Sequence, residues 1–94
     1  GLTANTPFTP NNIMTVYGTN SNVGIGTTTP VASAKLEVSS TTSGFLPPRM
    51  TATQASAIST PAQGLLLFVT DTDGTFTSVG WWGYNGATWE KLNN

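Results

Sequence analysis

An Asn85-Gly86 pair lies between two short segments rich in aromatic residues, close to the C-terminal end of this 94-residue chain. Both central positions of a two-residue hairpin turn require a positive φ, which asparagine and glycine adopt most readily. The pair therefore predicts a C-terminal β-hairpin in which Trp82 lies opposite Trp89. This register gives the aromatic residues two faces, with Trp82, Tyr84 and Trp89 on one and Trp81, beside Leu92, on the other.

Four other segments have the patterns of β-strands, namely residues 13–17, 23–26, 34–38 and 65–71. Alternation predicts that the apolar residues of the third segment, Ala34, Leu36 and Val38, point into a core while Lys35 and Glu37 face water. The unbroken apolar run Leu65–Val69 predicts burial on both faces of its strand. In Val23–Gly26, the two glycines share a face that another backbone can approach closely.

The segment Gly44–Met50 reads Gly-Phe-Leu-Pro-Pro-Arg-Met. Its consecutive prolines, Pro47 and Pro48, fix an extended backbone and remove two hydrogen-bond donors. Arg49 is a candidate ligand-binding cation, but one isolated arginine is weak support for a site. We favour a structural role, in which Arg49 binds carbonyls or pairs with Glu37 or an aspartate, which can belong to a neighbouring subunit.

A short helix is predicted directly after this segment. Thr51 and Gln54 have the spacing of a capping box, in which the threonine caps the helix and the glutamine reaches back to it. Pro61 ends the element. Together, these patterns predict a mainly β fold with one short helix.

Composition excludes several classes of function. Charged residues make up 7% of the chain, against about 25% in ordinary soluble domains, and cysteine and histidine are absent. The chain therefore lacks an imidazole base, a thiol nucleophile and the usual ligands of structural zinc. Three cations are too few for a nucleic-acid surface, and no apolar run is long enough for membrane insertion.

Asp71 and Asp73 are the only close pair of carboxylates in the sequence. Their Asp-x-Asp-Gly sequence matches part of a calcium loop, but the later ligands are missing. We interpret it as a polar turn rather than a metal site or the carboxylate pair of a hydrolase. We therefore expect no enzymatic activity, no cofactor and no metal.

A domain of this length buries its surface inefficiently, and neither disulfides nor Cys/His metal sites are available to stabilise it. The hydrophobic content of 37% and the net charge of −1 are not typical of a disordered chain. Oligomerisation is therefore the expected means of stabilisation. The chain begins at Gly1 without a signal-peptide pattern, as a fragment of a longer protein would.

The C-terminal aromatic residues have two interpretations. Exposed rings at Trp81, Tyr84 and Trp89, with Asn85 beside them, would form a platform that stacks on a sugar ring. Alternatively, the rings supply the core or a subunit interface, because each aromatic side chain buries about 150–250 Å². We favour the second interpretation for Trp82 and Trp89 and leave both open for Trp81 and Tyr84.

Two stretches together resemble a known module. The first is Asn22–Pro30 followed by Ala34–Val38, and the second runs from Gly44–Thr51 through Pro61–Leu66 to Tyr84–Trp89. This combination resembles a module of bacteriophage tail fibres that also occurs in fibre-like surface proteins of Bacteroidetes-type bacteria. The resemblance covers roughly residues 22–92, and the Gly-Phe-Leu-Pro-Pro-Arg-Met string is its more specific part.

The resemblance implies an intertwined homotrimer whose chains run parallel about a threefold axis. Gly24 and Gly26 would let strands approach that axis. Leu65, Leu67 and Val69 would face both their own core and the neighbouring subunits. The scarcity of charge fits this arrangement, because a charge near the axis faces its own like-charged copies.

A fibre module of this kind predicts two parts, a Thr/Asn/Pro-rich extension of shaft or linker type at residues 1–21 and a β-rich head or tip domain at residues 22–94. Such a trimer would attach a virus to its host by binding a surface glycan or protein receptor, and it would be located in the virion. The alternative is a bacterial adhesin or a carbohydrate-binding module with exposed aromatics, located at the bacterial cell surface.

Overall fold

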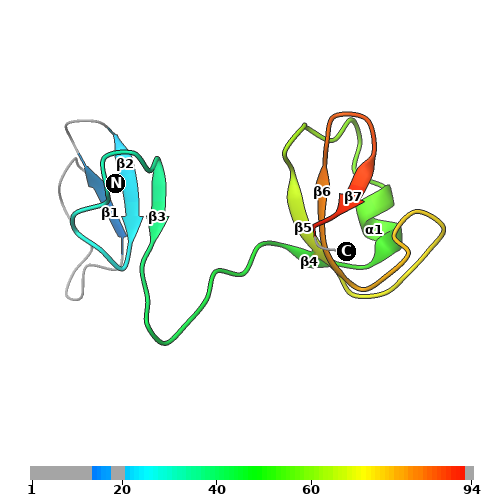
Figure 1. Cartoon of the computed structure of the whole chain (residues 1–94), viewed down its shortest axis with the longest axis horizontal. Coiled ribbons are helices and arrows are strands. Elements are labelled where there is room, and N and C mark those ends of the chain that lie inside the picture. The colour runs from blue at the N-terminus through cyan, green and yellow to red at the C-terminus, as the bar shows by residue number, and fades with distance from the viewer. Residues whose placement is uncertain (1–13, 18–20, 93–94) are drawn as a thin grey trace. The chain divides into compact units, whose positions relative to one another are not determined.

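The computed structural model describes residues 14–17 and 21–92, and the chain divides into two compact units, Gly1–Phe45 and Leu46–Asn94 (Figure 1). The described residues form seven strands in two sheets and one short helix. The predicted fold class, mainly β with one short helix, is therefore confirmed. The boundary predicted after residue 21 falls inside a hairpin, whose paired strands lie on either side of it.

The first unit contains a three-stranded sheet of order β1–β2–β3. Strand β1 (Met14–Tyr17) pairs antiparallel with β2 (Asn22–Ile25), and β2 pairs parallel with β3 (Leu36–Val38). All three strands were predicted, although β2 lies one residue earlier than expected and β3 is two residues shorter; Ile13 lies outside the described residues. Ser21 turns the chain between β1 and β2 with a φ of 60°.

The expectation that Leu36 and Val38 point into a core is wrong for the single chain. Their side chains are 54% and 40% exposed. The cause lies in the connection between β2 and β3, which crosses the opposite face of the sheet. There Thr27 and Pro30 pack directly over Gly24, and the Asn22 side chain donates hydrogen bonds to the carbonyls of Val31 and Ala32. The connection thus covers the glycine face, while on the apolar face Leu36 and Val38 are exposed and the residues of β1 and β2 are half-buried.

The second unit contains a four-stranded sheet of order β4–β5–β6–β7. Strands β4 and β5 are parallel, whereas β5–β6 and β6–β7 are antiparallel. The strands have the bounds Arg49–Met50, Leu66–Val69, Gly80–Tyr84 and Trp89–Lys91. Helix α1 (Ala52–Ser56) follows β4, and its capping box is formed by Thr51 and Gln54 as predicted.

The core of the second unit lies between this sheet and the segments that carry α1 and Phe76. Its buried hydrophobic residues are Ala52, Ala55, Leu67, Val69, Phe76 and Trp82. Strand β5 alternates, because Leu67 and Val69 are buried while Leu66 is exposed. One face of this strand is therefore buried within the chain, and burial of the other face against a second subunit stays a prediction. The central role of Phe76 was not predicted, since it stands alone in a polar segment.

The C-terminal hairpin is confirmed, but its predicted register is wrong by two residues. Tyr84 pairs with Trp89 and Trp82 with Lys91, so Asn85–Thr88 forms a four-residue loop. The Asn85 side chain causes the shift, because its Oδ1 accepts hydrogen bonds of 2.8 Å from both Ala87 N and Thr88 N. Side chains alternate with a period of two, so this shift leaves the predicted faces unchanged.

Candidate functional site

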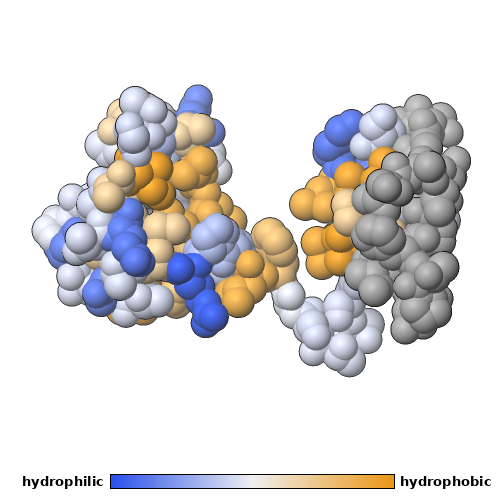
Figure 2. All heavy atoms as spheres, turned by 180° about the vertical axis from the view of Figure 1, so that it is seen from behind, coloured by the Kyte–Doolittle hydropathy of each residue, from blue (hydrophilic) through white to orange (hydrophobic). Residues whose placement is uncertain are grey.

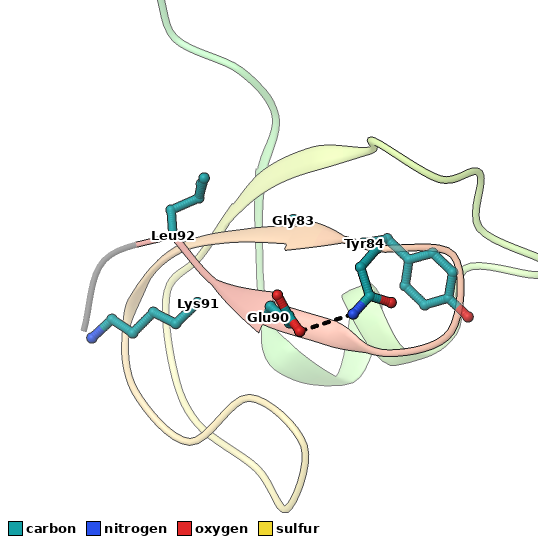
Figure 3. A pocket seen from close by; sticks show the side chains of 6 residues that line it. Gly83, Tyr84, Glu90, Lys91 and Leu92 are labelled. Atoms are coloured by element: carbon teal, nitrogen blue, oxygen red, sulfur yellow. Dashed lines mark hydrogen bonds between the residues drawn. The ribbon is translucent and has the colours of Figure 1, made fainter.

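The hairpin formed by β6 and β7 carries an open pocket of about 240 Å³ (Figure 3). Two of the four predicted receptor-binding residues, Tyr84 and Asn85, line it, whereas Trp81 and Trp89 do not. The lining residues are Gly83, Tyr84, Asn85, Glu90, Lys91 and Leu92. Glu90 and Lys91 were not predicted as site residues, because neighbouring charges of opposite sign are common on solvated strands.

Hydrogen bonds hold the polar groups of this pocket in place. Asn85 Nδ2 donates to Glu90 Oε2 at 2.9 Å and to Thr88 Oγ1 at 3.2 Å. The Glu90 carboxylate can still accept further hydrogen bonds, and Lys91 can donate them. The pocket therefore offers the Glu90 carboxylate and the Asn85 amide to a small polar group such as a set of sugar hydroxyls. The side chains of Tyr84 and Lys91 belong to the opposite face of the hairpin from Glu90, and Figure 3 shows them directed away from its carboxylate.

The aromatic rings do not form one platform. Trp81 packs edge-on against Phe68, with ring centroids 5.0 Å apart, on the face of the sheet opposite Tyr84. The Trp89 ring centroid lies 5.3 Å from that of Phe76 and 5.1 Å from that of Tyr84. Trp89 therefore packs against the edge of the hydrophobic core. Of the three rings predicted for stacking, only Tyr84 adjoins the pocket.

Both aspartates accept backbone hydrogen bonds, Asp71 from the start of α1 and Asp73 from its own turn. Asp71 Oδ1 accepts from Ala52 N at 2.7 Å. Asp73 Oδ1 accepts from Phe76 N at 2.7 Å and Thr75 N at 2.8 Å. These backbone donors, with Ser56 adding a smaller effect, hold the pKa of Asp73 below its usual value. A general acid requires the opposite shift, and this geometry is that of a polar turn.

Residues 14–17 and 21–92 contain no group of three or more histidine, cysteine, aspartate or glutamate side chains arranged to hold a metal ion. Within the same part of the chain, no helix has the length and apolar character needed to cross a membrane.

The proline-rich segment leads into strand β4. Pro47 is buried, and the carbonyl of Pro48 accepts a hydrogen bond of 3.0 Å from Phe68 N, which continues the β4–β5 pairing. Arg49 is exposed on β4. Among the residues that the structure describes, no ion pair joins Arg49 to Glu37 or to an aspartate. Pairing with an acid of a neighbouring subunit stays a prediction.

The two glycines predicted at a trimer axis are required within the chain itself. A Cβ on Gly24 would lie 2.6 Å from the carbonyl oxygen of Thr27. A Cβ on Gly26 would overlap the carbonyl oxygen of Ser39, and Gly26 has a φ of +79°. These contacts explain both glycines without a second subunit, and their place at an axis stays a prediction.

Leu65, Leu67 and Val69 were predicted at a subunit interface. Leu67 and Val69 lie in the core of their own chain, and Leu65 is half-buried. A subunit contact on β5 would therefore use its opposite face, which carries Leu66 and Phe68.

Hydrophobic side chains are exposed on both units (Figure 2). On the first sheet, the apolar face carries Leu36 and Val38. On the second, the face away from the core carries Leu66, Phe68 and Trp81, of which Leu66 is exposed. The alternation of apolar and polar residues assigns side chains to the two faces of a strand. It does not tell which face the rest of the chain covers, so the exposure of these apolar side chains could not be predicted from it.

Comparison with known proteins adds one finding to this geometry. Residues 24–94 match a family model described as "Phage tail like trimerisation region". The match spans most of the chain and includes the end of β2, the whole of β3 and the whole of the second sheet, whereas β1 lies before it. Comparisons with curated proteins and with solved structures found no match.

Proposed function

The chain belongs to the family of phage tail-like trimerisation regions, and on this premise we propose that it forms a structural, receptor-binding segment of a trimeric tail fibre. Membership of a trimerisation family implies that the chain associates with two further copies of itself. The finer proposal is that the resulting trimer mediates attachment to the host cell surface.

The observation that carries this proposal is the family match across residues 24–94, which starts within β2 and continues beyond β7. The open apolar faces support it, because a stable monomer rarely exposes contiguous apolar surface of this kind. The small core of the second unit supports it further, since a chain of 94 residues gains buried area by association. A fibre segment of this kind would act without enzymatic activity.

Static light scattering of the whole chain at micromolar concentration tests the trimer. We expect a mass about three times the 9.8 kDa of one chain. A stable monomer across the concentration range would contradict the proposal. The same measurement after dilution gives the concentration at which the trimer dissociates.

The pocket beside Tyr84 supports a glycan as the receptor. It joins the Glu90 carboxylate to the Asn85 amide by a hydrogen bond, and Tyr84 and Lys91 also line it; a carboxylate and an amide are groups that bind sugar hydroxyls. Glycan-array binding by the wild type should be lost in Tyr84→Ala and Lys91→Ala variants and retained in Thr72→Ala, a change in an exposed turn. Undiminished binding by both pocket variants would place the receptor contact elsewhere.

The proposed location is the virion, as part of a tail fibre. The alternative is a bacterial surface adhesin built from the same kind of module. Mass spectrometry of purified virions and of washed bacterial surface fractions distinguishes the two, because only one of them should contain the chain.

A further inference from the structure

We propose that three copies of this chain meet through the open apolar face of the first sheet, so that the trimer has an intermolecular core on its axis. This inference rests on the proposed trimer and names the surface that builds it. It places the axis on the apolar side of the sheet and so replaces the expectation that Gly24, which lies on the other face, approaches the axis. The face consists of side chains from β1, β2 and β3: Met14, Val16, Val23, Ile25, Leu36 and Val38.

The register of the sheet makes this face continuous. Val16, Val23 and Leu36 form one row across the three strands. Met14, Ile25 and Val38 form a second row. Directly opposed residues of paired strands point to the same face, so six apolar side chains lie together without a polar one between them.

In an ordinary small domain the apolar face of a sheet is covered by the rest of the chain, whereas in this sheet the covered face is the other one. Its covered face carries Thr15 and Gly24, while Leu36 and Val38 are exposed on the other. Every fully buried hydrophobic residue in the described part of the chain belongs to the second unit. On the apolar face of the first unit, Leu36 and Val38 are exposed and Met14, Val16, Val23 and Ile25 are half-buried. The edge formed by β3 is therefore the part of this face that another chain can cover.

Charge favours this face over the open face of the second sheet. None of its six residues is charged, and Glu37 of β3 lies on the opposite face, where Oε1 accepts a hydrogen bond of 2.8 Å from Val31 N. The open face of the second sheet includes Arg49 and Glu90 at register positions beside Phe68 and Gly83. Identical charges repel near a threefold axis, so the uncharged sheet is the one suited to identical copies.

Single-cysteine crosslinking tests this surface, since the chain contains no cysteine. We expect Val38→Cys, treated with a short bismaleimide, to give covalent dimers. A bifunctional linker joins two of three equivalent sites, so at most about two-thirds of the chains should be crosslinked. The matched control is Val79→Cys, because Val79 is also an exposed valine at 50% but lies in the second unit.

The outcomes separate this inference from the proposed trimer. Dimers from Val38→Cys in clear excess over Val79→Cys would support the inference. A trimeric protein that gives no dimer from Val38→Cys, or equal yields from both variants, would overturn it while leaving the trimer intact. A monomeric wild type would contradict the proposed trimer itself.

A second measurement uses buried charge. Leu36→Asp should raise the concentration at which the trimer dissociates by at least about tenfold, because three carboxylates would be brought together in an apolar core. Val79→Asp should leave it unchanged. Circular dichroism confirms that both variants keep their strands, and an unchanged trimer in Leu36→Asp would overturn the inference.

Discussion

The carboxylate of Asp71 accepts a hydrogen bond of 2.7 Å from the backbone nitrogen of Ala52, nineteen positions earlier in the chain. Ala52 is the first residue of α1, and Asp71 follows the end of β5. The first backbone N–H groups of a helix have no partner within it, and a negative charge beside them is favourable. This contact, together with the hydrogen bond from Thr70 N to Met50 O, joins the helix start to the end of the sheet's second strand.

We expect Asp71→Ala to lower the free energy of unfolding by about 1–2 kcal/mol, because it leaves Ala52 N without its acceptor. Chemical denaturation at one fixed chain concentration measures the change, since trimer stability depends on concentration. Thr72→Ala, an exposed neighbour, is the control and should change the stability little. Equal effects of the two substitutions would contradict the capping role.

The second prediction concerns pH and Asp73. Backbone donors from Phe76 and Thr75 lower the pKa of this carboxyl, so the folded state prefers its ionised form. Its contribution to stability is present above the usual aspartate pKa of about 4 and is lost as the pH falls through the lowered folded value. Thermal unfolding can be measured at intervals of about one pH unit from about pH 6 down to about pH 2. The melting temperature should therefore fall more steeply with decreasing pH in the wild type than in Asp73→Asn.

A control for this pH effect is Ser56→Ala. The serine hydroxyl also donates to Asp73, but its effect on the pKa is smaller than that of the two backbone donors. Ser56→Ala should therefore keep most of the acid dependence. If Asp73→Asn and the wild type lose stability in parallel, the lowered pKa does not contribute to folding.

Interactions between near neighbours in sequence were predictable. The capping box of Thr51 and Gln54 needs only residues three apart, and the structure forms it as expected. The hairpin and the faces of its aromatic residues were also predictable, because alternation and the Asn-Gly signal are local. Its register was not, since it depends on which backbone groups the Asn85 side chain binds.

Features that depend on distant segments could not be predicted from these patterns. Alternation correctly placed Leu36 and Val38 together on one face, but the β2–β3 connection covers the other. Phe76 was missed because its polar neighbours give no strand or helix pattern. The pocket residues Glu90 and Lys91 were missed for a similar reason, since only the hairpin register brings them beside Asn85.

The third prediction tests the core around Phe76. Its ring lies 5.2 Å from Trp82 and 5.3 Å from Trp89, and no part of the residue is exposed. Phe76→Ala should destabilise the second unit by about 3–5 kcal/mol, which is a large share of the stability of a small domain. Tryptophan fluorescence during denaturation reports directly on the two neighbouring rings.

The control for Phe76 is the same change at an exposed position, Phe45→Ala. It should cost under about 0.5 kcal/mol, because no packed cavity is created. Should Phe76→Ala prevent folding, Phe76→Leu retains most of the buried volume and should be less destabilising. A loss at Phe76 no larger than that at Phe45 would contradict the core assignment.

The fourth prediction concerns the hairpin loop. Asn85→Ala removes the acceptor of two backbone hydrogen bonds and the donor to Glu90, so we expect a loss of about 1–2 kcal/mol in the free energy of unfolding. Ala87→Ser, an exposed change in the same loop, is the control. Amide hydrogen exchange should show faster exchange at Thr88 in Asn85→Ala, and unchanged protection there would contradict the role of the asparagine.

The last prediction uses two glycines of the first unit that differ in their surroundings. A Cβ on Gly26 would overlap the carbonyl oxygen of Ser39, and its φ of +79° is unfavourable for other residues. Gly44 has no heavy atom within 4 Å of the same position. Gly26→Ala should therefore destabilise the first sheet by more than about 1 kcal/mol, whereas Gly44→Ala should be neutral or slightly stabilising.

Amide exchange separates these two variants at a defined contact. Ser39 N donates a hydrogen bond of 2.8 Å to Ile25 O, directly beside Gly26. Displacement of Ser39 by the new methyl group should break this bond, so exchange at Ser39 should accelerate in Gly26→Ala and stay unchanged in Gly44→Ala. Because β3 carries Leu36 and Val38, loss of its attachment to β2 should also weaken the trimer. If the Ser39 amide exchanges at the same rate in both variants, the close approach of residue 26 to the Ser39 backbone does not require a glycine.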